Sequence, residues 1–118
     1  MASGPSGVVG SEQDQGTTLP LTGVGLTLLH QAPQQYGIFD DIRIWVTNLD
    51  TVDRTLTIFW GSDADPGAKI PMTIPPGVGP VNIIPGWPLE RGLTVKGQAS
   101  AANVLNVITL VNRISPYT

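Results

Sequence analysis

The chain contains one histidine, His30, a side chain that often carries acid–base chemistry or binds a metal ion near neutral pH. It ends an apolar run, and the chain has no second histidine and no cysteine, so carboxylates alone would have to complete a zinc site. A Ser-His-Asp triad also needs a nucleophile, and no local pattern marks any serine for that role. We therefore assign His30 no catalytic or metal-binding role and expect it at the solvent-facing end of a strand.

Two pairs of closely spaced aspartates could supply carboxylate chemistry. Asp40 and Asp41 are adjacent, so in a strand they point to opposite faces and cannot act as general acid and base on one substrate. We expect them to be solvated and to protect a sheet edge. Asp63 and Asp65 precede a Pro-Gly dipeptide and resemble the start of a calcium loop, but the third oxygen ligand and the distal glutamate are missing. An ordinary turn is the better interpretation.

The glycine-rich segments lack the context of a phosphate-binding or cofactor-binding loop. Gly-Val-Gly occurs at residues 23–25 and 77–79, in both cases without the spacing or the helix that a phosphate cradle requires. The chain also has no G-x-S-x-G elbow and no G-x-x-x-x-G-K-[ST] loop. The sequence therefore predicts no catalytic residues, no metal ligands and no cofactor, and a protein that is not an enzyme.

Three tryptophans are the best basis for a ligand-binding interpretation. Trp45, Trp60 and Trp87 could form a stacking platform for sugar rings, because aromatic faces offer a large amphipathic contact area. Trp60, however, shares a strand face with Leu56 and Ile58 and is expected in the core, while Trp87 stands between two prolines in an expected turn. A carbohydrate-binding module is therefore an alternative and not the main hypothesis.

Composition limits the class of protein. A chain of 118 residues has room for one domain, and 41% hydrophobic against 13% charged residues favours a packed core over disorder. The six Lys and Arg residues are scattered and the net charge is −3, which argues against a nucleic-acid partner. No stretch approaches the ~20 apolar residues of a membrane helix, and the first residues lack the features of a secretory signal, so we expect synthesis in the cytoplasm and no membrane partner. Without cysteine, stability must come from packing or from oligomer contacts.

Fourteen glycines and eleven prolines interrupt the chain at short intervals, which favours short strands joined by turns. Alternation and apolar runs predict about seven strands, at residues 25–30, 38–48, 55–60, 69–74, 81–84, 93–99 and 104–114. This density is typical of an all-β domain, a small β-sandwich or jelly-roll-like fold, with a small closed barrel as the alternative. Residues 1–22 show no sustained period, and we expect a flexible N-terminal arm there, followed by a β-sandwich domain at 23–118.

The pattern also predicts which side chains face the core. In the strand at 38–48 the inward residues are Ile42, Ile44 and Val46, and in the strand at 93–99 they include Leu93 and Val95. The pieces at 69–74 and 81–84 are bounded by prolines, which cannot donate to a strand ladder, so we expect them at sheet edges or bulges. A turn is expected at 85–88.

The last predicted strand carries apolar residues on both faces. Leu105, Val107 and Val111 share one face, whereas Val104, Ile108 and Leu110 lie on the other. Such a strand lies in the centre of a sheet or is covered by a neighbouring subunit. We therefore expect a homo-oligomer, with a trimer favoured, and we include Leu110 and Val111 among the partner-binding residues.

Several short segments carry a family resemblance. They are IPPG at 74–77, PGWPL at 85–89, GLTV at 92–95, ASAANV at 99–104 and VNRI at 111–114. In their pattern and their order along the chain, these segments resemble small structural proteins of tailed-bacteriophage virions, and the resemblance covers roughly residues 38–114. The resemblance implies a virion structural protein, most readily a capsid decoration or cement protein on the outside of the capsid, with a head–tail connector, tail or fibre-associated protein as the alternative. The implied partners are the major capsid protein or other virion proteins, and the implied location is the virion.

The expected arm has a role in this hypothesis. Its apolar side chains are too few to fold alone but could fill grooves on a partner, so the arm would become ordered on docking. The residues concerned are Val8, Val9, Leu19 and Leu21.

Overall fold

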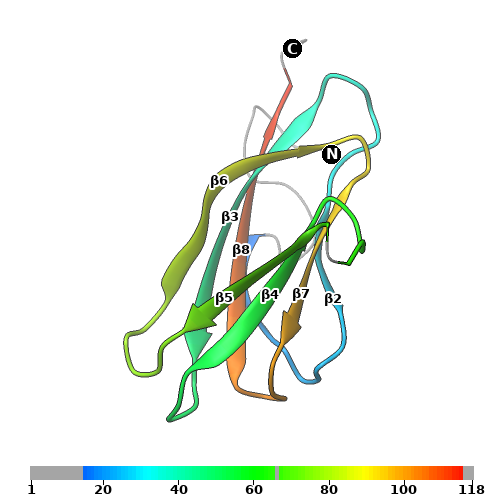
Figure 1. Ribbon diagram of the computed structural model, residues 1–118. Helices are drawn as coiled ribbons and strands as arrows, with labels where there is room; N and C mark the ends of the chain where they lie inside the picture. Colours follow the sequence, from blue (N-terminus) through cyan, green and yellow to red (C-terminus); the bar gives the residue numbers. More distant parts are fainter. Residues whose placement is uncertain (1–14, 66, 116–118) are drawn as a thin grey trace.

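The structure is a computed structural model that describes residues 15–65 and 67–115, and it confirms an all-β domain. Its strands are β1 (Gln15–Pro20), β2 (Thr27–Gln31), β3 (Phe39–Asn48), β4 (Arg54–Trp60), β5 (Lys69–Ile74), β6 (Val81–Glu90), β7 (Thr94–Ala99) and β8 (Leu105–Ile114). Figure 1 shows these strands as two layers. No helix able to span a membrane occurs in the described part of the chain.

Two four-stranded sheets pack against each other. Sheet A has the order β1-β8-β3-β6, and sheet B has the order β2-β7-β4-β5. The antiparallel pairs are nested along the sequence, because the first strand pairs with the last, the second with the second-last, and so on. These pairs are β1 with β8, β2 with β7, β3 with β6 and β4 with β5. This connectivity is that of a jelly roll, and the predicted sandwich is confirmed over the alternative of a closed barrel.

The core lies between the two sheets and follows the predicted alternation. Ile42, Ile44 and Val46 of β3 are completely buried, and the inward residues of β8 are buried beside them. Leu93 does not follow the prediction, because β7 begins only at Thr94 and leaves Leu93 44% exposed in the preceding turn. Alternation therefore identified the faces of the strands, but not where β7 begins.

The predicted boundary of the arm is wrong. Residues 15–20 form β1, the edge strand of sheet A, and Leu21 is 1% exposed within the core. The Leu21 amide donates to the carbonyl of Leu105 at 3.0 Å, and its carbonyl accepts from the amide of Asn103 at 2.9 Å. The domain thus begins by residue 15 and not at 23, while residues 1–14 lie outside the described part of the chain.

Strand β6 contradicts the turn predicted at 85–88, because it continues through both prolines to Glu90. It is an edge strand, as is β5 with Pro71, so the predicted edge placement of the proline-bounded pieces is confirmed. The register of β3 against β6 shifts beside Gly86, where Arg43 pairs with Pro85 and Ile42 with Trp87. Gly86 has φ +133°, so a glycine forms a bulge there and the strand absorbs the prolines without ending.

Candidate functional site

The only histidine lies in the core and not at the solvent-facing position we predicted. The register between β2 and β7 shifts after Leu28, so that Leu29 and His30 are both buried. This bulge turns the imidazole inward, and its Nε2 lies 2.5 Å from Oδ2 of Asp40 on β3. Arg113 on β8 donates to the same carboxylate, from Nε at 2.8 Å and from Nη2 at 3.0 Å. The three side chains therefore link strands of both sheets.

The prediction that Asp40 is solvated is also wrong, since it is 0% exposed, whereas Asp41 does point to the other face. Burial raises the pKa of the Asp40 carboxyl, but the hydrogen bonds from His30 and Arg113 together lower it by more, so the pKa lies below its ordinary value. His30 is only 3% exposed, and a substrate could not reach either group. The arrangement is suited to holding the two sheets together.

Several of the other acidic groups are engaged by cations. Asp63 accepts a hydrogen bond from Lys96 at 2.9 Å, and Asp65 lies 3.5 Å from the ammonium of Lys69. Asp50 accepts from Nε of Arg54 at 2.7 Å. Within residues 15–65 and 67–115, no three His, Asp or Glu side chains gather in a way that could hold a metal ion.

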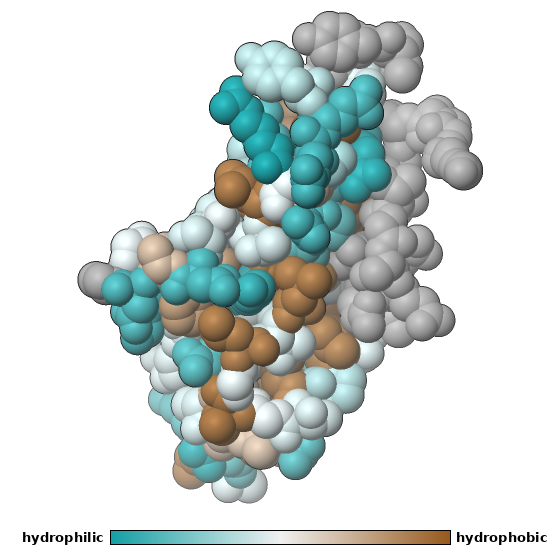
Figure 2. Space-filling model, turned by 90° about the vertical axis from the view of Figure 1, so that its right-hand side faces the viewer, coloured by the Kyte–Doolittle hydropathy of each residue, from teal (hydrophilic) through white to brown (hydrophobic). Residues whose placement is uncertain are grey.

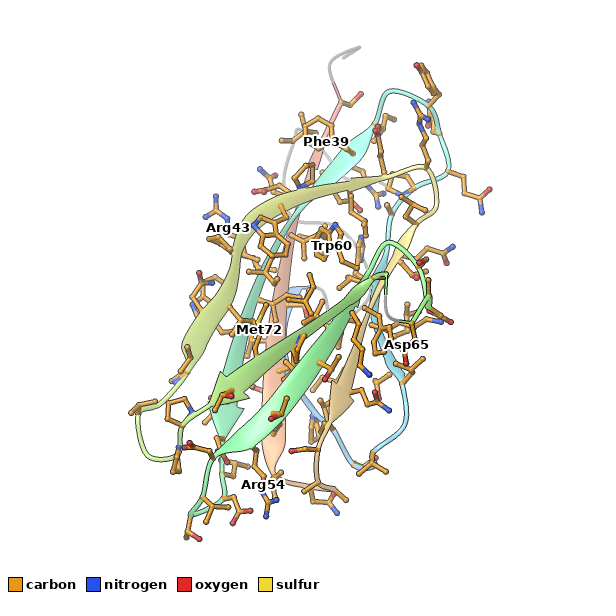
Figure 3. The ribbon with its side chains drawn as sticks, viewed as in Figure 1. Phe39, Arg43, Arg54, Trp60, Asp65 and Met72 are labelled. Carbon is orange, nitrogen blue, oxygen red and sulfur yellow. The ribbon has the colours of Figure 1, made fainter. Side chains whose placement is uncertain are left out.

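The three tryptophans do not form a common platform. Trp60 of β4 and Trp87 of β6 pack edge to face, with ring centroids 5.2 Å apart and an interplanar angle of 84°, and both contact the core. Figure 3 shows Trp60 between the two layers. Trp45 alternates with the buried residues of β3 and so lies on the outer side of sheet A. The core position of Trp60 is confirmed, whereas Trp87 is not a turn residue.

The predicted partner-binding residues are placed very differently. Val8 and Val9 lie outside the described residues. Leu19 packs half-buried against the core, and Leu21 belongs to it, so neither is an arm contact as predicted. Val111 is likewise a core residue at 0% exposure, and replacing it would disturb the core and not an interface. Only Leu110, half-buried on the outer side of sheet A, keeps a place in a candidate interface.

A surface that we did not predict lies at one end of the sandwich. Four loops cross between the sheets at the lower end of Figure 1, at residues 21–26, 49–53, 75–80 and 100–104, and we call them the loop end. Among the described residues, eight large hydrophobic side chains are exposed, and five of these belong to the loop end. They are Val24 (55%), Leu26 (44%), Leu49 (59%), Val52 (51%) and Val78 (59%). Figure 2 shows apolar side chains gathered on the lower half of one face, toward this end.

Hydrogen bonds hold two loops of this end, 21–26 and 49–53, against neighbouring strands. The buried amide of Asn48 donates to the carbonyls of Val52 at 2.9 Å and Ile74 at 2.8 Å, while its oxygen accepts from the amide of Asp50 at 2.8 Å. The Gln98 side chain donates to the carbonyl of Val24 at 3.1 Å. Four of the five exposed aliphatic side chains, all except Val78, are therefore presented on loops held by hydrogen bonds.

The charge of the loop end is low and acidic. Its four loops contain no Lys or Arg, and their two acidic residues are Asp50 and Asp53. Asp50 is paired with Arg54, whereas Asp53 is exposed and forms no ion pair among the described residues. Both Gly-Val-Gly segments were visible in the sequence, and in the second of them Val78 lies between Gly77 and Gly79, which both have a positive φ.

Comparison of the chain with known proteins identified no relative. No family model, curated protein or solved structure matches the chain.

Proposed function

We propose that this protein is a structural component of a virion, a capsid decoration or cement protein that attaches to the outer surface of the shell through its loop end. The observation that carries the proposal is the gathering of five exposed aliphatic side chains on three of the four loops at one end of the sandwich. Exposed apolar side chains gathered at one place on the surface are typical of protein interaction sites. The jelly-roll connectivity is in keeping with the proposal by analogy of fold, because viral capsid proteins use it, as do lectins.

The chemistry of the loop end indicates what kind of partner it fits. It offers aliphatic side chains and has no aromatic or basic residues. Aromatic and basic side chains are the groups that favour binding to a lipid surface or to nucleic acid, so neither partner is indicated. The exposed carboxylate of Asp53 adds one negative charge at the rim. A protein surface with shallow apolar pockets and a Lys or Arg opposite Asp53 is the complement, and we assign that surface to the major capsid protein.

The alternatives differ in where the chain would be found on a particle. A head–tail connector, a tail protein or a fibre-associated protein would be present in few copies. A carbohydrate-binding module is less well supported, because Trp45 is separated from Trp60 and Trp87 by the thickness of sheet A.

The test is to count and map the chain on purified virions, and then to reattach full-length chain to virions made without it. We expect hundreds of copies on the shell, and we expect Val24→Asp with Val78→Asp to weaken reattachment about tenfold or more, because charges would enter apolar contacts. Leu93→Asp is the matched control, since Leu93 is as exposed as Leu26 but lies at the opposite end. A few copies at the neck or tail would overturn the decoration assignment, and equal losses in both variants would overturn the role of the loop end.

A further inference from the structure

The outer faces of the two sheets differ in chemistry. On sheet A the outward positions of the central strands place Trp45 of β3 directly opposite Ile108 of β8, and Arg43 opposite Leu110. The three apolar side chains are half-buried and point away from sheet B, the only other layer among the described strands. They lie in neighbouring rows of the two central strands of the sheet.

The central strands of sheet B present a more hydrophilic outer face, although the edge strand β2 carries Leu28, which is 50% exposed and pairs with Lys96. The outward side chains of its central strands are Thr55, Thr57 and Phe59 on β4, and Thr94, Lys96 and Gln98 on β7. Phe59 pairs with Lys69 on one side and with Lys96 on the other, and it is only 5% exposed. Long lysine stems can cover an aromatic ring while their ammonium groups stay in water. Sheet A is therefore the sheet whose outer face retains an apolar centre.

The charge of this face suits contact with a second copy of the chain. In the rows from Asp41 to Thr47, the charged residues on β3 and β8 are Asp41 and Arg43, and these pair with each other at 3.5 Å. Figure 3 shows Arg43 extending outward from the strands. The central part of the face therefore carries no net charge, although the chain carries −3. Two acidic chains can meet there without strong repulsion.

Pairing between the sheet edges of two copies is disfavoured, so we expect two copies to contact each other through the outer face of a sheet. The edge strands β1, β2 and β6 each contain a register shift, and β5 contains Pro71. Pro20 ends β1, while Pro85 and Pro88 lie within β6. Bulges and prolines are the devices that prevent the addition of a further strand to an exposed edge.

The outer face of sheet A has a larger area than the loop end. The molecule measures 47 × 28 × 20 Å. A sheet face that spans the two longer extents offers on the order of 1,300 Å², compared with about 800 Å² per partner in a stable interface. The loop end spans the two shorter extents, on the order of 560 Å², and falls short of that size. The outer face of sheet A thus offers the area that a stable interface between two chains requires, and the loop end does not.

From these observations we infer that the protein forms a two-fold dimer in which the outer faces of sheet A from two copies pack on each other around Trp45, Ile108 and Leu110. A face that packs on an identical face gives a closed pair, which favours a dimer over the trimer expected from the sequence. Two loop ends would then belong to one assembly, and two weak attachments can act together with a higher effective affinity.

The test measures the mass of the full-length chain by light scattering and sedimentation over a range of concentrations. We expect the mass of two chains for the wild type and of one chain for Leu110→Asp, with an unchanged far-ultraviolet dichroism spectrum. Thr57→Asp is the matched control, because Thr57 is a half-buried outward residue on a central strand of sheet B, and this variant should stay dimeric.

If Leu110→Asp fails to fold, Ile108→Ser decides the question, and we expect it to raise the dimer dissociation constant about tenfold or more. A wild-type monomer at high concentration, or a trimer, would overturn the inference. So would a folded Leu110→Asp or Ile108→Ser variant that dimerises as tightly as the wild type, or dissociation caused equally by Thr57→Asp. The assay uses no virion, so its outcome is independent of the assignment to a capsid.

Discussion

His30 and Asp40 come from different sheets and meet in the core with 2.5 Å between Nε2 and Oδ2, where neither is more than 3% exposed. This hydrogen bond joins the two sheets of the sandwich. Arg113 supplies the compensating positive charge from β8, so the carboxylate is held between a ring from one sheet and a guanidinium from the other. The stability of the fold should therefore depend on Asp40 far more than on its neighbour Asp41.

Asp40→Asn should lower the free energy of unfolding by about 3 kcal/mol, because breaking a buried ion pair leaves its partners without their counter-charge. Asp41→Asn is the control. Asp41 pairs with the exposed Arg43, so its loss should cost less than about 1 kcal/mol. Urea unfolding measures both values, and equal losses in the two variants would contradict a structural role for the buried carboxylate.

Acid should weaken the wild type more than Asp40→Asn. In the folded protein the pKa of Asp40 lies below its ordinary value of about 4, because the hydrogen bonds from His30 and Arg113 outweigh the effect of burial. The ionised carboxylate thus stabilises the fold fully above pH about 4, and this contribution is lost as the pH falls from there through the lowered pKa. The pKa of Asp50 is also lowered, first by the Thr51 amide and then by Arg54, but this effect is common to both proteins. Unfolding free energies measured between about pH 6 and pH 2 should converge in acid, and parallel curves would rule out this linkage.

Gly86→Ala should destabilise the protein by about 1 to 3 kcal/mol, because residue 86 holds φ +133° at the bulge of β6. An added Cβ would also lie 3.1 Å from Oδ1 of Asp41. Gly25→Ala is the matched control, since no atom lies within 4 Å of its added Cβ and its φ is not in the positive range. Thermal unfolding compares the two variants, and a Gly86→Ala protein as stable as Gly25→Ala would show that the bulge tolerates a side chain.

Truncation at the N-terminus should have different effects on the two sides of residue 15. Deletion of residues 1–22 removes β1 and the buried Leu21, and we expect the loss of cooperative unfolding, since truncating one buried leucine alone costs about 2 to 5 kcal/mol. Deletion of residues 1–14 leaves both in place and should keep a cooperative transition. Dichroism followed during heating distinguishes these outcomes. Cooperative unfolding of the shorter protein would mean that β1 is dispensable.

The sequence predicted the fold class because alternation is a local property that survives in most strands. Residues 69–74, for example, were predicted as a strand and form β5 with the same bounds. It did not predict the position of His30, because a bulge in β2 shifts the alternation by one residue and no residue type marks such a bulge. β1 was missed for a related reason, since QGTTLP has neither alternation nor an apolar run and depends on β8 for its strand conformation.

The candidate surfaces were only partly predictable. Leu110 was named from the two apolar faces of the last strand, but Val111 beside it is buried, because one face of a central strand belongs to the core. The loop end depends on four loops that are far apart in sequence and come together only through the jelly-roll connectivity. No window of sequence contains that surface, although its Gly-Val-Gly turns were visible.

The pairing of β1 with β8 also affects the order in which the protein can fold. The first described strand finds its partner in the last, and β2 pairs with β7, so neither sheet can be completed until almost the whole chain has been synthesised. Folds dominated by such distant pairings form slowly, typically in milliseconds to seconds. During synthesis, Leu21 and the apolar residues of β3 and β4 therefore lack their full set of packing partners until β7 and β8 have left the ribosome. A chain interrupted before residue 105 would retain unpaired apolar strands and should aggregate instead of folding in part.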